Sequence, residues 1–313
     1  MRTVGAGRMR LGLAAGLLAA LTWFPGCSLV ANVAVNSIAG LLAEGEAVFR
    51  SDDDLDLVKA PLANNLWLME TMLETSPEHR EILLSATKGF LLFTYGFVEP
   101  DLFELDFTQF EEKQAVRRRA ARLYRRATGY GMRGLEVNHS GIEARLRSSP
   151  ETAAAELEAE DAALALWTGT ALGAWIAMDT DNPEATADLS LMGALLHRSR
   201  ELDDTVDDGV VYDYLMLYEV SRIGGSVERA REFYEHALEI GPERLPVLWS
   251  SWAESGSVAS GDRGEFEALL RQALDFDIDS EPGSRLVNQI AQERAAWLLR
   301  NVDDYFLDDM QNR

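Results

Sequence analysis

Hydrophobic residues recur along this chain mainly at the three- and four-residue spacing of amphipathic helices. Leu66, Met69 and Leu73 share one helical face early in the chain, and Ala291 and Leu298 share another near its end. Strand-like runs of Val, Ile and Thr are scarce, whereas the helix-favouring residues Ala, Leu, Glu and Arg are abundant. The pattern predicts helices over residues 62–74, 110–129, 162–178, 185–202, 210–223, 227–240, 246–255, 266–276 and 286–306, and one that contains 89–98 and ends before Pro100.

Residues 162–178 contain no charged side chain, which sets them apart from the other predicted helices. The segment is short for a membrane span and includes Thr168 and Thr170, so we expect a central helix buried on all sides. Gly169 and Gly173 lie four residues apart on it, which indicates either close approach of a neighbouring helix or room for a ligand.

Aromatic side chains on the apolar helices are the candidates for lining a pocket. Such side chains usually belong to the core, and that interpretation stays open. If a pocket exists, we expect it at the glycine-containing helix. The candidate ligand-binding residues are Trp167, Gly169, Gly173, Trp175 and Tyr212.

The clearest internal pattern is Ala230, Tyr234, Ala237 and Pro242, at offsets of zero, four, seven and twelve. This is the second-helix signature of a tetratricopeptide repeat, in which small alanines let two helices approach and a proline ends the helix. The first three offsets recur at Ala120, Tyr124 and Ala127 and at Phe266, Leu270 and Ala273. We therefore predict an all-α fold of degenerate tetratricopeptide-like helical hairpins in an α-solenoid-like single domain. Chance matches in an alanine-rich chain are the alternative.

The N-terminal segment has the pattern of an export signal. Arg2, Arg8 and Arg10 precede the apolar run 11–24, and Cys27, the single cysteine, follows at the position of a bacterial lipobox. An ordinary signal peptide followed by a free cysteine is the alternative. We expect a signal peptide over 1–26, a lipidated N-terminus with a tether and short helix over 27–50, the helical domain over 51–306 and a C-terminal tail over 307–313.

The formal net charge of −23 disfavours nucleic acid and anionic lipid as partners, because no general basic surface offsets the repulsion. One predicted helix, 110–129, nevertheless contains a cluster of arginines. A solvated helix face explains this cluster, and a docking patch for an acidic partner is the alternative.

Chemistry-bearing motifs are scarce. The four histidines, His79, His139, His197 and His236, are far apart in the sequence, so we expect no metal site. Asp275, Asp277 and Asp279 alternate as in a calcium loop, but the glycine and the closing acidic residue of such a loop are replaced. No phosphate loop or nucleophile motif occurs. We expect a binding protein without cofactors, not an enzyme.

Several segments resemble one known family. They are 54–61 (DLDLVKAP), 66–73 (LWLMETML), 74–77 (ETSP), 83–84 (LL), 89–90 (GF), 124–127 (YRRA), 166–169 (LWTG), 174–175 (AW) and, most distinctive, 285–299 (RLVNQIAQERAAWLL). Together they resemble TatT, the T component of TRAP-type transporters, a family of tetratricopeptide-like periplasmic lipoproteins. The resemblance covers residues 51–306.

The resemblance implies a homotrimer, partnership with the transporter's periplasmic solute-binding protein, and a hydrophobic ligand channel. It implies a periplasmic protein held to a membrane by its N-terminal lipid. Ser28 after the cysteine favours the outer membrane over the inner one, by analogy with other lipoproteins. A structural repeat scaffold of the cell envelope, without ligand transport, is the alternative function.

Overall fold

The computed structural model describes residues 45, 47–106 and 108–306, and these residues contain helices and no strand. The longer helices are α3 (Leu55–Thr75), α4 (Arg80–Phe97), α5 (Phe110–Glu136), α8 (Ala162–Met178), α10 (Leu189–Leu202), α12 (Val211–Ser221), α13 (Val227–Ile240), α14 (Leu245–Trp252), α16 (Arg263–Asp275) and α17 (Arg285–Arg300). The shorter helices are α6 (Ile142–Ser148), α7 (Pro150–Ala154), α9 (Pro183–Ala187), α11 (Val206–Gly209), α15 (Val258–Ser260) and α18 (Val302–Tyr305). The all-α prediction is confirmed. The predicted signal peptide, Cys27 and the tail 307–313 lie outside the described residues.

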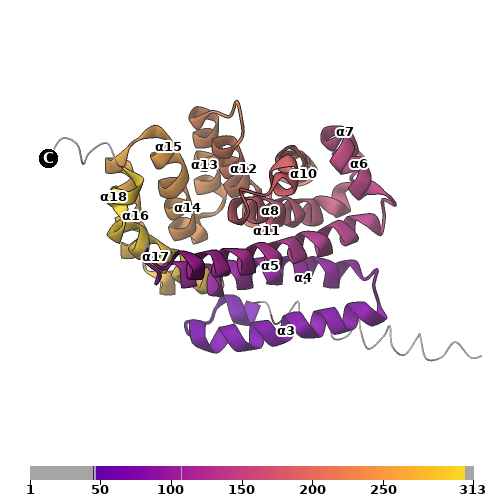
Figure 1. The fold of residues 1–313 in the computed structure, drawn as a ribbon, viewed down its shortest axis with the longest axis horizontal. Helices are drawn as coiled ribbons and strands as arrows, with labels where there is room; N and C mark the ends of the chain where they lie inside the picture. Colours follow the sequence, from indigo (N-terminus) through magenta and orange to yellow (C-terminus); the bar gives the residue numbers. More distant parts are fainter. Residues whose placement is uncertain (1–44, 46, 107, 307–313) are drawn as a thin grey trace, which may run out of the picture. The chain divides into compact units, whose positions relative to one another are not determined.

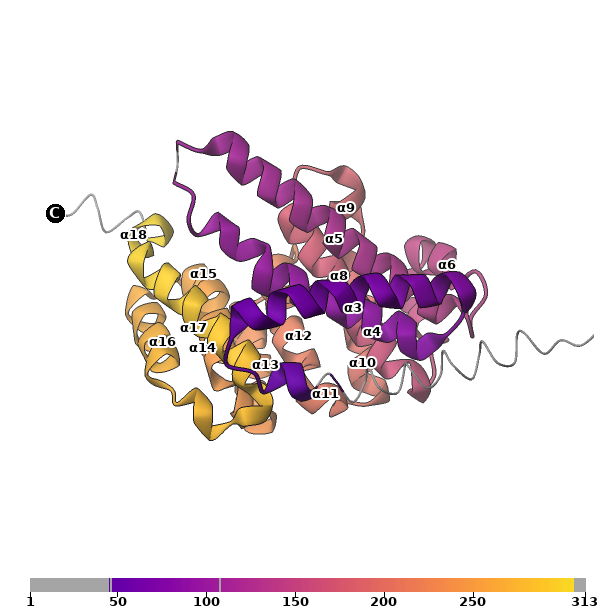
Figure 2. The ribbon, with the colours of Figure 1, turned by 90° about the horizontal axis from the view of Figure 1, so that it is seen from below.

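Helices that follow one another in the chain pack against one another. In Figures 1 and 2, α3, α4 and α5 lie side by side as long helices, and α14 to α18 gather at one end of the described residues. Between them, α8 packs against α5 and α10, and α12 packs against α10 and α13. One hydrophobic cluster extends from Val58 on α3 to Ile290 on α17, and a smaller one joins α16 to α17.

The uncharged helix α8 has the predicted bounds and lies among α4, α5, α10 and α12. Helix α5 approaches α8 closely because glycines of α5 face it. A Cβ atom at Gly131 would lie 2.2 Å from Thr168 Oγ1, and one at Gly134 would lie 2.6 Å from Leu164 Cδ2. On the other side, a Cβ at Gly169 would meet Leu196 at 3.1 Å. Gly169 therefore serves the close approach of α10.

The residues of the repeat pattern are buried in their helices. Ala230, Tyr234 and Ala237 are the buried residues of α13, and Pro242 begins the 3₁₀ turn η3 (Pro242–Arg244) after it. The two matching triplets, on α5 and α16, are also buried. The pattern thus identified the packed faces of three helices, while their classification as tetratricopeptide repeats stays a prediction.

Several helix bounds differ from the prediction because of local capping and turn residues. Helix α3 begins before the apolar pattern 62–74, directly after the acidic residues 52–54, which predict a helix cap. The cap is confirmed, since the Asp54 carboxylate accepts a hydrogen bond from Leu57 N at 3.0 Å. Helix α5 continues to Glu136, beyond the predicted end at 129. The predicted helices 185–202 and 286–306 are each divided, at Asp188 and at Asn301.

Helix α17 and the turn before it contact the segment that precedes α3. The Arg285 guanidinium donates to Ser51 O at 2.8 Å, and Arg50 Nε donates to Gly283 O at 3.0 Å. Farther along, the rings of Phe103 and Trp297 stack at 4.7 Å. The segment before α3 is therefore joined directly to α17 and the turn before it.

The stretch Arg80–Leu102, which is α4 with the turn η1 (Glu99–Leu102), is long and apolar enough to cross a membrane by length and composition. However, 61% of its apolar window is buried by the rest of the fold. A core helix passes the same test, and α4 packs against α3, α5 and α8 as a core helix does.

Candidate functional site

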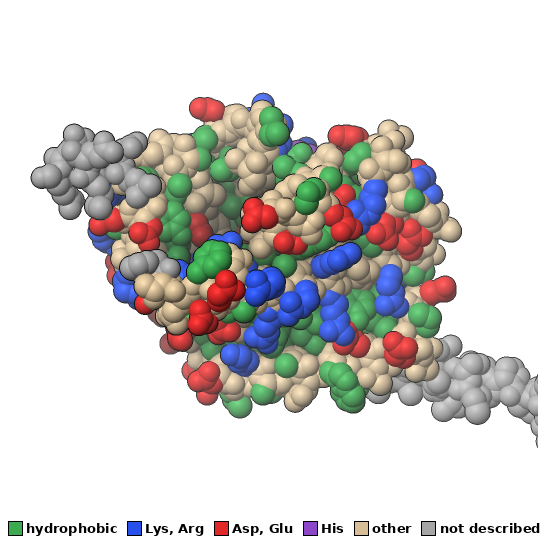
Figure 3. All heavy atoms as spheres, viewed as in Figure 1, with side chains coloured by type: hydrophobic (Ala, Val, Ile, Leu, Met, Phe, Trp, Pro, Cys, Tyr) green, Lys and Arg blue, Asp and Glu red, His purple; other side chains and the backbone are tan. Residues whose placement is uncertain are grey.

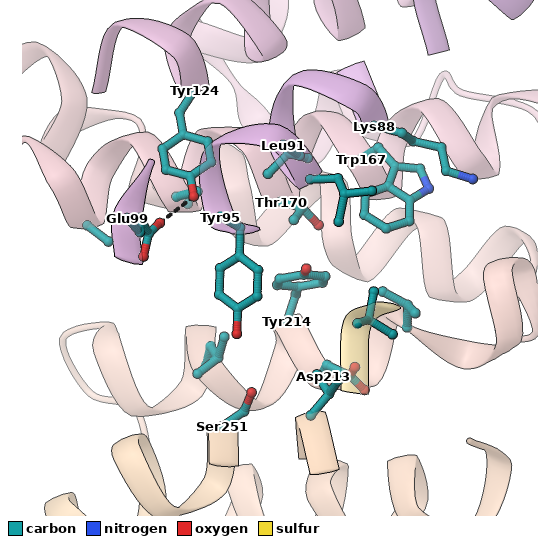
Figure 4. A pocket seen from close by; sticks show the side chains of 18 of the residues that line it. Lys88, Leu91, Tyr95, Glu99, Tyr124, Trp167, Thr170, Asp213, Tyr214 and Ser251 are labelled. Carbon is teal, nitrogen blue, oxygen red and sulfur yellow. Dashed lines mark hydrogen bonds between the residues drawn. The ribbon is translucent and has the colours of Figure 1, made fainter. Parts of the chain in front are cut away.

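A cavity of about 720 Å³ lies inside the helical domain. Side chains from α3, α4, α8, α12, α14 and α17 line it, and Figure 4 shows some of them directed toward its interior. Most of its wall is aliphatic, including Leu62, Leu91, Ile176, Met192 and Leu217. Its size falls within the range of small-molecule sites.

Two tyrosines place hydroxyl groups at this apolar space. Tyr95 on α4 extends toward the middle of the view in Figure 4, and Tyr214 on α12 lies near it. Burial raises the pKa of both phenols, so both stay protonated. Neither hydroxyl forms a hydrogen bond with another described residue, which leaves both available to a ligand.

One end of the cavity holds a buried charge network. The Glu99 carboxylate accepts a hydrogen bond from the Tyr124 hydroxyl and lies 3.3 Å from Arg294. Arg294 also donates to both oxygens of Glu254, at 2.7 and 2.9 Å. Burial disfavours the charged guanidinium, but the carboxylates of Glu254 and Glu99 hold the pKa of Arg294 well above its ordinary value. The network fixes α17 against η1.

The other end is formed where Lys88 and Trp167 meet Asp207. Trp167 Nε1 donates to Asp207 Oδ2 at 2.5 Å, and Lys88 Nζ lies 3.3 Å from Asp207 Oδ1. The ammonium of Lys88 is also 5.3 Å from the centroid of the indole ring. Beside this group, Arg50 lies 3.8 Å from Asp208.

The α11 turn that carries Asp207 and Asp208 has an uncommon backbone. Asp207 (φ 47°, ψ 49°), Asp208 (φ 60°, ψ 35°) and Gly209 (φ 72°) are consecutive left-handed residues. Each such non-glycine residue costs on the order of 1 kcal/mol, and such strain is common at functional sites. Arg244 stabilises the turn by donating to Asp208 O at 2.8 Å.

Asp213 and Arg244 form a buried ion pair at the cavity wall, 2.5 Å apart. Burial raises the pKa of Asp213 to about 6 despite the opposing charge of Arg244. Asp213 Oδ1 and the hydroxyl of Thr170 are buried without a hydrogen-bond partner among the described residues. Both atoms have almost no accessible surface, so they lie behind the cavity wall and not on it.

The charges of the lining residues balance one another. Four cationic side chains, Arg50, Lys88, Arg244 and Arg294, each lie within 4.0 Å of an acidic one. The four acidic lining residues are Glu99, Asp207, Asp208 and Asp213. A chain with a net charge of −23 thus encloses a cavity whose wall has no excess of either sign.

The structure brings only some of the predicted pocket residues to this cavity. Trp167 and Gly173 line it. Gly169 packs on α10, and Trp175 is buried with its indole nitrogen 3.4 Å from Asp179. The Tyr212 hydroxyl donates to Asp204 at 3.1 Å, and its ring contacts His236. These three are not among the lining residues.

Sequence reasoning missed Tyr95, Lys88 and the α11 turn. A signal for Lys88 existed, because it is the only charged residue between Glu81 and Glu99 in an otherwise uncharged segment. The consecutive residues Asp207, Asp208 and Gly209 were a turn signal. In the part of the chain that the structure describes, no group of three or more His, Cys, Asp or Glu is placed to hold a metal ion.

Comparison with known proteins gives one family and one relative. The family model described as TRAP transporter T-component matches residues 51–306. A chain from Treponema pallidum (strain Nichols), described as an uncharacterized protein, is 27% identical over 304 residues, which cover 90% of this chain and 94% of the relative. The family match spans nearly all of the described residues.

Proposed function

The chain belongs to the TRAP transporter T-component family, and on that premise we propose that it binds an amphipathic organic molecule in its cavity and docks the transporter's solute-binding protein. Membership of this family implies association with other TRAP transporter components and an accessory, non-catalytic role. The cavity of about 720 Å³ is the observation that carries the proposal for a ligand.

The chemistry of the wall favours a ligand with an aliphatic body and hydrogen-bonding groups. The aliphatic lining suits the aliphatic body of such a ligand, while the hydroxyls of Tyr95 and Tyr214 suit its polar groups. Because each cationic side chain already has an acidic partner, an organic anion would have to displace one of them, such as Asp207 beside Lys88. An uncharged or protonated ligand needs no such displacement.

The proposal places the protein in the periplasm as a homotrimer, attached to the outer membrane by a lipid on Cys27. Support comes from the signal-like segment 1–26, the single cysteine after it and the family resemblance. Mass spectrometry of the protein from bacterial membranes tests the acyl modification, and sedimentation velocity of the soluble form tests the trimer.

Native mass spectrometry of the purified protein tests for the ligand. We expect a bound small organic molecule whose amount Ala177→Phe lowers, because Ala177 lines the cavity and a phenyl ring there takes up part of its space. Ala60→Phe is the matched control, since Ala60 is also an exposed helical alanine but does not line the cavity. A wild-type protein that never carries a small molecule and does not bind the solute-binding protein would instead support the envelope scaffold.

A further inference from the structure

A row of arginines covers the outer face of α5. Arg117, Arg118, Arg119, Arg122, Arg125 and Arg126 are all exposed, and Figure 3 shows blue side chains gathered across the middle of this view, over α5. The opposite face of the helix, with Ala120, Tyr124 and Ala127, is buried. The row is therefore a continuous cationic strip on an acidic protein.

Half of these arginines have no acidic partner among the described residues. Arg119, Arg125 and Arg126 pair with Asp101, Glu184 and Glu70. Arg117, Arg118 and Arg122 form no ion pair within the described part of the chain. Like charges four residues apart on a helix, such as Arg118 and Arg122, destabilise it. Helix stability therefore does not account for the row.

An exposed tryptophan lies beside the row. Trp67 on α3 is 70% exposed, although tryptophan is usually well buried. One turn later, Glu70 accepts a hydrogen bond from Tyr130 on α5 at 2.5 Å and pairs with Arg126. Trp67 thus lies one helical turn from the residue that pairs with Arg126. We call these exposed side chains the arginine–tryptophan face: Trp67, Arg117, Arg118, Arg122, Arg125 and Arg126.

We propose that the arginine–tryptophan face is the docking surface for the solute-binding protein, whose matching surface carries carboxylates and an apolar recess for the Trp67 ring. This inference rests on the docking role proposed above. Arginine and tryptophan are the residues that most often dominate the affinity of protein interfaces. Charge complementarity also speeds the encounter of the partners.

A protein partner fits this face better than a membrane does. Exposed acidic side chains border the row, including Asp101, Glu111, Glu112 and Glu184. An anionic bilayer would meet these carboxylates together with the arginines, and the net charge of −23 would repel it further. A folded protein can place each carboxylate opposite one arginine.

The test is a binding titration of the full mature chain with the solute-binding protein of the same transporter. We expect Arg118→Glu/Arg122→Glu to weaken binding about tenfold or more at low ionic strength, and to flatten the salt dependence. Arg118→Lys/Arg122→Lys restores most of the affinity, because it keeps the charges. Trp67→Ala weakens binding about tenfold or more with little change in salt dependence.

The controls make equal changes elsewhere. Arg271→Glu/Arg300→Glu reverses two exposed charges on α16 and α17, and Ile223→Ala truncates a side chain that is 99% exposed. These variants keep wild-type affinity. Circular dichroism confirms that every variant is folded, which is expected because the altered side chains are exposed.

The outcomes separate this inference from the function on which it rests. If wild-type protein binds and the face variants bind equally well, the docking surface lies elsewhere and only this inference fails. If wild-type protein does not bind at all, the proposed docking role fails with it. If the arginine variants instead lose binding to phosphatidylglycerol vesicles, or change the sedimentation of the protein alone, the face belongs to a membrane or a second copy, and the inference is overturned.

Discussion

Trp167 Nε1 donates a hydrogen bond of 2.5 Å to Asp207, which lies 40 positions later in the chain on a left-handed turn. The same carboxylate lies 3.3 Å from Lys88. One side chain on α11 therefore links α4 and α8 at the end of the cavity. The left-handed turn places this carboxylate between two donors.

Substituting each of the two aspartates of this turn with glycine distinguishes the cost of the left-handed backbone from the stabilisation that the side-chain contacts provide. We expect Asp208→Gly to leave the free energy of unfolding unchanged or raise it by up to about 1 kcal/mol, because glycine adopts the left-handed conformation without strain. Asp207→Gly gains the same relief but loses the contacts to Trp167 and Lys88, and we expect a net loss of about 1–2 kcal/mol. Urea denaturation measures both. Equal effects of the two substitutions would show that the Asp207 contacts contribute nothing.

The buried network around Glu99 is expected to stabilise the contact between η1 and α17. Glu99→Ala leaves Arg294 without one of its buried partners, and we expect a loss of about 3 kcal/mol in the free energy of unfolding. Tyr124→Phe removes one hydroxyl donor and is expected to cost about 1 kcal/mol. A double-mutant cycle of these two substitutions measures their coupling. Additive effects would contradict a direct interaction between them.

Asp213 is expected to make stability depend on pH. Its pKa in the folded protein, about 6, lies above its ordinary value of 3.8, so the folded state holds this proton where the unfolded state has lost it. Proton binding by Asp213 therefore adds at most about 3 kcal/mol to the free energy of unfolding. This stabilisation is fully present below pH 3.8 and is lost as the pH rises through 6. Asp213→Asn lacks this proton equilibrium. We expect the stability of wild type relative to Asp213→Asn to fall between pH 4.5 and about 7. A constant difference would contradict the raised pKa.

Two glycines on α5 provide a matched pair. No atom lies within 4 Å of a Cβ built at Gly129, so Gly129→Ala is expected to stabilise the protein by about 0.5–1 kcal/mol through helix propensity. At Gly131 the same Cβ would lie 2.2 Å from Thr168 Oγ1, so Gly131→Ala is expected to cost about 1–3 kcal/mol. Thermal unfolding compares the two. A stabilising Gly131→Ala would mean that α5 and α8 separate at little cost.

Apolar periodicity predicted helix bounds correctly where nearby residues in the sequence also mark the ends of the helix. Helices α8 and α13 have the predicted bounds, because an uncharged run and a Ser226 cap mark them in the sequence. The break at Asn301 was missed, since the apolar spacing continues through it to Val302. Apolar spacing predicts which face of a helix is buried, but it does not predict whether the helical backbone is continuous.

The cavity was predictable only in part, because it depends on residues that meet through tertiary packing. The uncharged helix indicated Trp167 and Gly173 correctly as lining residues. Glu99 and Arg294 are 195 positions apart, and no spacing rule connects them. Trp175 lies on the same helix as Trp167, eight residues later, and Tyr212 lies on α12, but neither lines the cavity. Which face of a helix meets the cavity depends on how the helices pack, and the local sequence does not show this.

The contacts of Arg285 with Ser51 and of Arg50 with Gly283 have a consequence for how such a chain can evolve. An open array of hairpins can be extended by duplicating its last unit, since the new unit stacks on an unoccupied surface. Here residues 50 and 51, before the first long helix, are hydrogen-bonded to residues 283 and 285, before α17, so a hairpin inserted between them would have to keep these bonds or break them. We expect relatives to differ in loops between helices more than in the number of helices.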